Sequence, residues 1–207
     1  MRIWPLLAAV LTAASLSACL PVTSKVPAGT SVGFKIDPTL LGTWIVRDKD
    51  GDKPAYLHFV GKDDGSMIAV LVESAHGQNQ GELDLYKIEV AQLGQNHIVN
   101  AQEIALGKEP AGENPLTNAY VLLCYRAGRP GRIAFYVMED AGVAAAIKAG
   151  KIAGRVDPGQ DGDVHVTAGA AALDKFLASP QASGLFKKPL FVATRIQLRG
   201  RAFVPSP

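Results

Sequence analysis

Cysteine is scarce in this chain of 207 residues, which has only Cys19 and Cys124. A framework of disulfide bonds is therefore excluded as the means of stabilising the fold. An excess of one charge is also missing, because 21 basic and 19 acidic side chains are interspersed along the chain. No basic face is concentrated enough to predict a nucleic-acid partner. Apolar residues make up 48% of the chain, which is enough for a core and argues against disorder.

Sequence motifs for catalysis and cofactor binding are missing too. The chain has no Gly-x-Ser-x-Gly nucleophile elbow and no glycine-rich phosphate loop after a strand. Its four histidines, His58, His76, His97 and His165, do not have the spacing of metal ligands on one helix or strand. We therefore predict a protein that is not an enzyme and that has no metal and no cofactor.

Two acidic stretches superficially resemble calcium loops. The first is Asp48–Asp52 (DKDGD), but a calcium-binding EF-hand loop needs glycine at its sixth position and glutamate at its twelfth, where this chain has Lys53 and Phe59. We interpret this stretch as a polar hairpin turn. Asp161-Gly162-Asp163 is interpreted in the same way.

The N-terminus has the pattern of an export signal. Arg2 supplies a positive charge, and an apolar run from Leu6 to Leu16 follows it, interrupted only by Thr12 and Ser15. Such a run is shorter than the roughly 20 residues of a membrane-spanning helix and suits the hydrophobic region of a signal peptide. We found no second run that approaches this length.

The end of this leader, Leu16-Ser17-Ala18-Cys19, resembles the lipobox of bacterial lipoproteins. The resemblance implies cleavage after residue 18 and acylation of Cys19, for example by palmitate, so that the mature protein is held to a membrane by lipid. Leu20 is not the aspartate that the same resemblance links to inner-membrane retention, which favours the outer membrane and a domain facing the periplasm. The alternative is an ordinary cleavable signal in which Cys19 has no role.

Short strand-like runs separated by turn residues fill most of the chain after Leu40. Asp-Gly pairs between apolar runs predict hairpins, and strands that follow one another without helices predict an antiparallel meander. Two short helices interrupt the later part, one capped by Asp140 and one capped by Thr167 and ended by Ser179-Pro180. The expected strands are 42–48, 55–60, 66–73, 83–90, 97–105, 119–126, 132–139, 151–156, 163–166 and 190–198.

These elements predict a mainly β fold with two short helices. We expect the meander to close into a lipocalin-like barrel or curved half-barrel, because open sheet edges invite aggregation. The predicted organisation is a signal peptide at 1–18, a lipidated N-terminus and tether at 19–36, one β-rich domain at 37–200 and a tail at 201–207. Residues 32–36 could instead already form the first strand.

Gly42-Thr43-Trp44 resembles the Gly-x-Trp of the first strand in lipocalin-like proteins. The resemblance implies that Trp44 plugs a closed barrel end and that an arginine from a late strand, here Arg195, packs over it. The alternative is that Trp44 is an ordinary core residue and Arg195 an exposed charge.

Aromatic residues are few and fall mostly in the expected strands. Trp44, Tyr56, Phe59, Tyr120 and Phe135 are our candidates for lining a ligand cavity, although they could equally be ordinary core residues. Cys124 lies in the apolar run AYVLLCYR, which predicts a buried and unreactive thiol rather than a nucleophile.

We therefore expect a lipid-anchored protein of the bacterial cell envelope that acts as a binding or accessory module for a small apolar ligand or an envelope protein. One alternative is a structural lipoprotein that stabilises an envelope complex and has no ligand cavity, and another is an envelope hydrolase. Cavity volume separates the first two: a space of several hundred Å³ favours ligand binding, whereas a filled interior with an exposed apolar patch favours a protein partner.

Overall fold

The computed structural model describes residues 21–47, 54–73, 83–104, 118–158 and 162–196. In order along the chain, the elements are β1 (Thr23–Ser24), β2 (Gly42–Arg47), β3 (Pro54–Gly61), β4 (Met67–Glu73), β5 (Leu83–Leu93), β6 (Asn96–Glu103), β7 (Tyr120–Ala127), β8 (Arg132–Val137), α1 (Asp140–Lys148), β9 (Gly154–Val156), β10 (Val164–Val166), α2 (Ala170–Leu177), α3 (Pro180–Ser183) and β11 (Pro189–Arg195).

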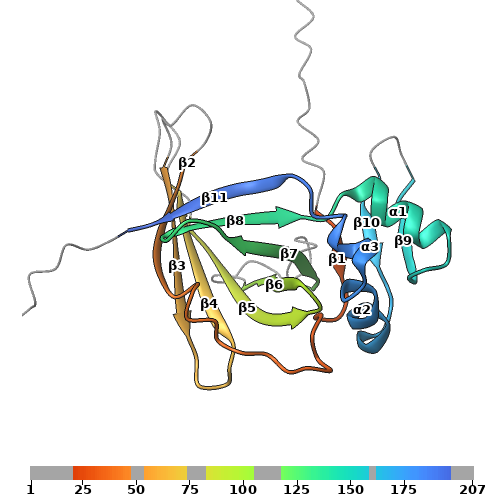
Figure 1. Ribbon diagram of the computed structural model, residues 1–207, viewed down its shortest axis with the longest axis horizontal. Helices are drawn as coiled ribbons and strands as arrows, with labels where there is room; N and C mark the ends of the chain where they lie inside the picture. Colours follow the sequence, from red (N-terminus) through yellow and green to blue (C-terminus); the bar gives the residue numbers. More distant parts are fainter. Residues whose placement is uncertain (1–20, 48–53, 74–82, 105–117, 159–161, 197–207) are drawn as a thin grey trace, which may run out of the picture.

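Eight antiparallel strands form a closed barrel (Figure 1). The meander from β2 to β8 pairs each strand with the next, and β11 then fills the gap between β8 and β2. The mainly β fold, the barrel and its likeness to a lipocalin barrel are therefore confirmed. Closure leaves the eight strands without a free edge, which is how such sheets avoid pairing with other chains.

The N-terminal segment departs from the expected tether. Val22, Thr23 and Ser24 are buried, and β1 pairs antiparallel with β7 and parallel with β10. With β9, these strands form a small extension of the sheet beside the barrel. Residues 32–36, offered as an alternative first strand, contain no strand. The domain therefore starts no later than residue 22, because side chains before position 37 already contribute to its core.

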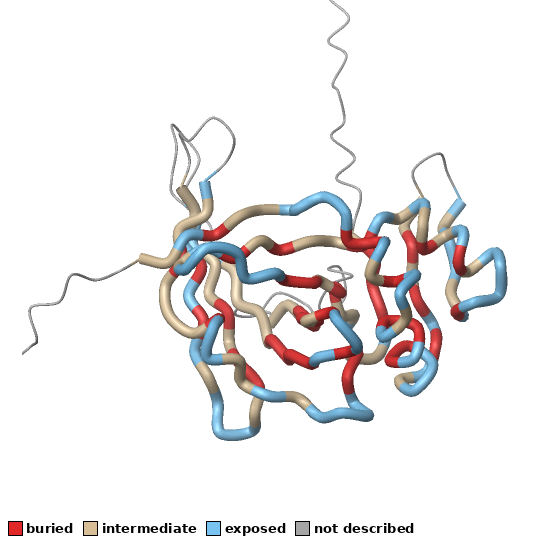
Figure 2. The backbone as a smooth tube through the Cα atoms, viewed as in Figure 1, coloured by how far each residue is buried: buried red, intermediate tan, exposed pale blue. Residues whose placement is uncertain are grey.

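The helices cover one side of the barrel, where they form a second core with its outer wall (Figures 1 and 2). Ile98, Leu122 and Cys124 point outward from β6 and β7 and pack with Leu173 and Phe186. There are three helices in the described part of the chain rather than two. Ser179-Pro180 ends α2 as expected but also starts α3, since the Ser179 hydroxyl accepts a hydrogen bond from the Ala182 amide.

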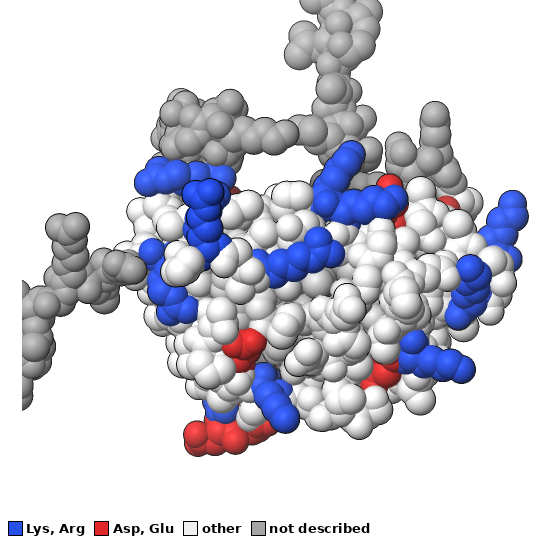
Figure 3. Space-filling view, in the orientation of Figure 1, with Lys and Arg blue, Asp and Glu red and all other residues white. Residues whose placement is uncertain are grey.

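The expected side-chain caps of the two longer helices are not found. The capping positions are Glu139 for α1 and Gly169 for α2, and neither helix has a side-chain capping bond. On the face of the molecule that Figure 3 shows, Lys and Arg side chains are dispersed rather than gathered in one groove.

Candidate functional site

The barrel encloses an apolar cavity of about 330 Å³. All eight barrel strands contribute to its wall, because alternate residues of each strand point inward. Glu73, at the end of β4, is the one charged residue among those that line it. The lining residues are Pro21, Val46, Ala55, Leu57, Phe59, Ala69, Leu71, Glu73, Tyr86, Ile88, Val99, Ala101, Val121, Leu123, Phe135, Leu190 and Phe191.

Aromatic rings form the inner part of this wall. Phe59 and Phe135 are stacked with their ring centroids 6.2 Å apart, and Phe135 and Phe191 are 4.9 Å apart. A space of this size has room for several water molecules, but a lining with so few polar atoms offers them few hydrogen bonds. The cavity is therefore better suited to an apolar ligand than to water.

The cavity lies toward the barrel end that we call the mouth. It is the end where β2, β4, β6 and β8 finish and where β3, β5, β7 and β11 begin. Pro21, Glu73 and Leu190 are lining residues on this side. The loops 48–53, 74–82 and 105–117, which connect strands here, are outside the described residues, and so is the expected turn at Asp48–Asp52.

The opposite end is closed by the pair that the family resemblance suggested. The guanidinium carbon of Arg195 lies 4.4 Å from the centroid of the Trp44 ring, within reach of a cation–π contact. Arg195 also donates hydrogen bonds to the carbonyls of Leu41 and Thr39, both at 2.6 Å. The Trp44 indole donates to the carbonyl of Leu40 at 2.7 Å. Trp44 is 2% exposed, so the indole is a plug with every polar atom paired.

Gly42 makes this closure possible. It has a φ of +104°, a backbone conformation that side chains with a Cβ rarely adopt, and a Cβ here would lie 3.2 Å from Nη1 of Arg195. The glycine thus lets the chain turn into β2 directly under the guanidinium.

The aromatic residues suggested by the sequence are divided between the two sides of the barrel wall. Phe59 and Phe135 line the cavity, and Trp44 lies in the same interior core at the closed end. Tyr56 points outward and is 38% exposed, whereas Tyr120 packs against the outer core under the helices. The placement of Tyr56 and Tyr120 as cavity residues is therefore corrected.

Strand alternation explains the division. Trp44 is opposite Leu57 in the β2–β3 register, so Leu57 and Phe59 point inward and Tyr56 points outward. Most of the wall is aliphatic. These aliphatic residues were not predicted from the sequence, because the candidates for the cavity were all aromatic. Extending the alternation from Phe59 along the same strand would have found Leu57 and Ala55.

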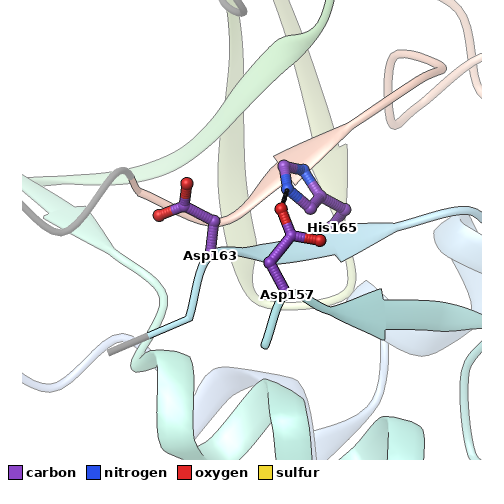
Figure 4. Close-up of side chains that lie close together, drawn as sticks. All are labelled: Asp157, Asp163 and His165. Carbon is purple, nitrogen blue, oxygen red and sulfur yellow. Dashed lines mark hydrogen bonds and ion pairs between the residues drawn. The ribbon is translucent and has the colours of Figure 1, made fainter. Parts of the chain in front are cut away.

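A polar cluster outside the barrel brings Asp157, Asp163 and His165 together (Figure 4). One candidate ligand atom from each lies within 4.8 Å of the others. However, His165 Nε2 contacts Asp157 at 3.2 Å, and Arg155 forms an ion pair with the same carboxylate at 3.0 Å. The Asp157 carboxylate thus already has Arg155 and His165 as partners within the protein. Of the expected turn Asp161-Gly162-Asp163, the first residue is outside the described part.

A second polar group lies at the closed end of the barrel. The Tyr125 hydroxyl donates a hydrogen bond to Asp37 and lies 3.4 Å from His97 Nδ1. Burial alone would raise the pKa of Asp37, but hydrogen bonds from Tyr125 and Thr39 outweigh it and hold that pKa below its ordinary value. Burial, together with the Asp37 carboxylate, raises the pKa of Tyr125 well above its usual range, so the phenol keeps its proton. The hydrogen bond between Tyr125 and Asp37 attaches the segment around Asp37 to the closed end of the barrel.

Cys124 is 1% exposed and belongs to the core between the barrel and the helices. Burial raises the pKa of its thiol, which keeps it protonated at neutral pH. Its predicted burial is confirmed, and its lack of reactivity stays a prediction.

Fold and cavity together define a closed eight-stranded barrel with an apolar cavity in its interior. No family model matches the chain, and neither the curated proteins nor the solved structures include a match. Within the described ranges, no helix is both long and apolar enough to cross a membrane.

Proposed function

We propose that this protein is a lipid-anchored binding module of the bacterial cell envelope that holds a small apolar ligand in its barrel. In this proposal Cys19 carries the lipid, the outer membrane holds the anchor, and the domain faces the periplasm and catalyses no reaction. The observation that supports ligand binding is the cavity of about 330 Å³. Its volume falls within the range of roughly 300–1,000 Å³ that is typical of ligand sites.

The shape of the wall favours an elongated ligand such as an acyl chain. The lining combines small side chains, Ala55, Ala69 and Ala101, with the rings of Phe59 and Phe135, which leaves a narrow apolar space between the strands. One end of the barrel is plugged by Trp44, so an occupant would enter from the mouth. The alternative of a structural lipoprotein without a cavity would be better supported by a filled barrel interior.

Ligand binding can be tested on the protein purified from membranes by native mass spectrometry. We expect it to carry, or to take up, an acyl-chain ligand. Ala101→Phe, which adds a ring inside the cavity, should abolish uptake, whereas Ala134→Phe on the outer face of β8 is the matched control and should leave it unchanged. Uptake by neither wild type nor control, or equal uptake by both variants, would rule out the cavity as the site.

The anchor is tested separately. The N-terminal peptide of the mature protein should begin at Cys19 and carry the mass of attached acyl chains. An unmodified N-terminus at another residue would contradict the anchor, and so would a Cys19→Ser protein that is processed normally and stays on the membrane.

A further inference from the structure

Apolar side chains are exposed around the mouth of the barrel. Tyr56, Val72 and Leu83 are 38%, 39% and 50% exposed, and the register places them directly opposite one another on β3, β4 and β5. Leu190, at the start of β11 on another part of the mouth, is 55% exposed. We call these four residues the rim. They come from four strands, and each lies within two residues of the strand end that borders the mouth.

The proposed anchor would emerge on the same side. Pro21 and Leu190 both line the cavity, and only Leu20 separates Pro21 from Cys19. A fully extended chain spans at most about 3.6 Å per residue, so Cys19 can lie no more than roughly 7 Å from Pro21. Because Val22, Thr23 and Ser24 are buried and β1 is paired in the sheet, this short link starts from a fixed point.

We propose that the rim docks onto the lipid bilayer, so that the barrel stands with its mouth against the membrane and its cavity opens to the lipid phase. This inference rests on the proposed anchor at Cys19. Tyrosine and aliphatic side chains suit the boundary between headgroups and acyl chains. Arg47 and Lys188, which are exposed next to the rim, would face the anionic headgroups. The cavity would then exchange its occupant with the membrane rather than with the aqueous phase.

In the described part of the chain, the helices leave Tyr56, Val72 and Leu83 uncovered. They pack on the outer wall of β6 and β7, whereas Tyr56, Val72 and Leu83 lie on β3 to β5 (Figure 1). A protein partner on the rim would have to fit between the domain and a lipid at most about 7 Å from Pro21. The bilayer is therefore the occupant that the short link favours.

Two variants, each with one added tryptophan, test this orientation in the acylated protein reconstituted into phospholipid vesicles. Leu83→Trp places the reporter on the rim, and Val60→Trp is the matched control. Val60 is 47% exposed on the same barrel wall, but it lies on β3 close to the closed end. Both variants also contain Trp44. Its fluorescence is measured in the wild-type protein and subtracted from that of each variant. Phospholipids brominated on their acyl chains quench tryptophans that reach the bilayer.

Quenching should be several-fold stronger for Leu83→Trp than for Val60→Trp. Inserting a flexible glycine-serine linker of about ten residues between Leu20 and Pro21 should reduce that difference, since the domain can then move away from the surface. Equal quenching of the two reporters, or no quenching of either, would overturn the orientation, and so would protection of the rim by a co-purified protein. Far-UV circular dichroism and the urea midpoint of both variants should match wild type.

The outcomes distinguish this inference from the proposed function. If Cys19 proves to be acylated and the cavity takes up an acyl chain, but the two reporters are quenched equally, the function stands and the orientation is wrong. If Cys19 carries no lipid, the proposed anchor fails before the reporters are compared, and the orientation fails with it.

Discussion

At the scale of single residues, Trp44 and Arg195 close one end of the barrel through several contacts at once. Trp44→Ala removes a fully buried indole and should lower the free energy of unfolding by about 3–5 kcal/mol. Arg195→Ala loses the cation–π contact and two hydrogen bonds to carbonyls, and should cost about 2 kcal/mol. Arg195→Lys keeps the charge but cannot donate to both carbonyls with the geometry of a guanidinium. Its free energy of unfolding should lie between those of wild type and Arg195→Ala. Urea denaturation measures all three, and an Arg195→Ala protein as stable as wild type would contradict this account of the closed end.

Asp37 should make stability depend on pH. Its pKa in the folded protein lies below the ordinary value of 3.8, so its contribution to stability is present above that value and is lost as pH falls through the lower folded pKa. Asp37→Asn should therefore be less stable than wild type at neutral pH. The difference in free energy of unfolding between the two proteins should become smaller as the pH is lowered. Urea midpoints at pH 7 and pH 3 measure this, with Tyr125→Phe as the partner variant that removes part of the same effect. A difference that does not change with pH would contradict it.

Cys124 should react slowly in the folded protein. The thiol is buried and its raised pKa keeps the thiolate fraction small at neutral pH. An aromatic disulfide reagent should label it many-fold more slowly in buffer than in denaturant. Rapid labelling under native conditions would show that the core between barrel and helices opens easily.

At the scale of elements, the N-terminal segment is held in place by buried polar side chains. Asp174 on α2 is 5% exposed and accepts hydrogen bonds from the amides of Gly29 and Ser31 and from the Ser31 hydroxyl. Asn100 on β6 exchanges two hydrogen bonds with the backbone of Ala28. These side chains attach residues 28–31 to a helix and a strand that follow much later in the sequence.

Asp174→Ala leaves these donors unpaired and should destabilise the protein by about 2–3 kcal/mol. Hydrogen exchange should show that the amides of Gly29 and Ser31 lose protection first, while the strands β5 and β6 stay protected. Asp174→Asn keeps part of the acceptor capacity and should have a smaller effect. Unchanged protection in the alanine variant would mean that apolar packing alone holds this segment.

Sequence patterns predicted the elements of the barrel well and the N-terminal segment poorly. Alternation and Asp-Gly turns located the barrel strands to within a few residues, because these signals are local. The role of residues 21–31 depends on Asn100 and Asp174, which lie far away in the chain and give no local signal. The pair Trp44 and Arg195 was suggested only by resemblance, whereas the aliphatic cavity wall could have been deduced from strand parity.

At the scale of the whole molecule, two cores share one barrel wall. The inner face of β5 to β8 surrounds the cavity with side chains such as Val99 and Val121, and the outer face of the same strands packs under the helices through Ile98 and Leu122. The helices can therefore stabilise the wall without filling the interior. The cavity therefore lies toward the mouth, while Trp44 plugs the other end of the barrel.

Trp44 provides a direct measurement of occupancy. The chain has two tryptophans, and Trp4 lies in the proposed signal peptide, so the mature protein would contain Trp44 alone at the barrel floor. Stearic acid with a nitroxide near its methyl end should quench Trp44 fluorescence saturably. It should do so more strongly than stearic acid with a nitroxide near its carboxyl group, because an apolar interior favours the methyl end over the charged carboxylate, and Ala101→Phe should abolish the effect. Quenching that does not saturate, or that Ala101→Phe leaves unchanged, would contradict an acyl chain held inside the barrel.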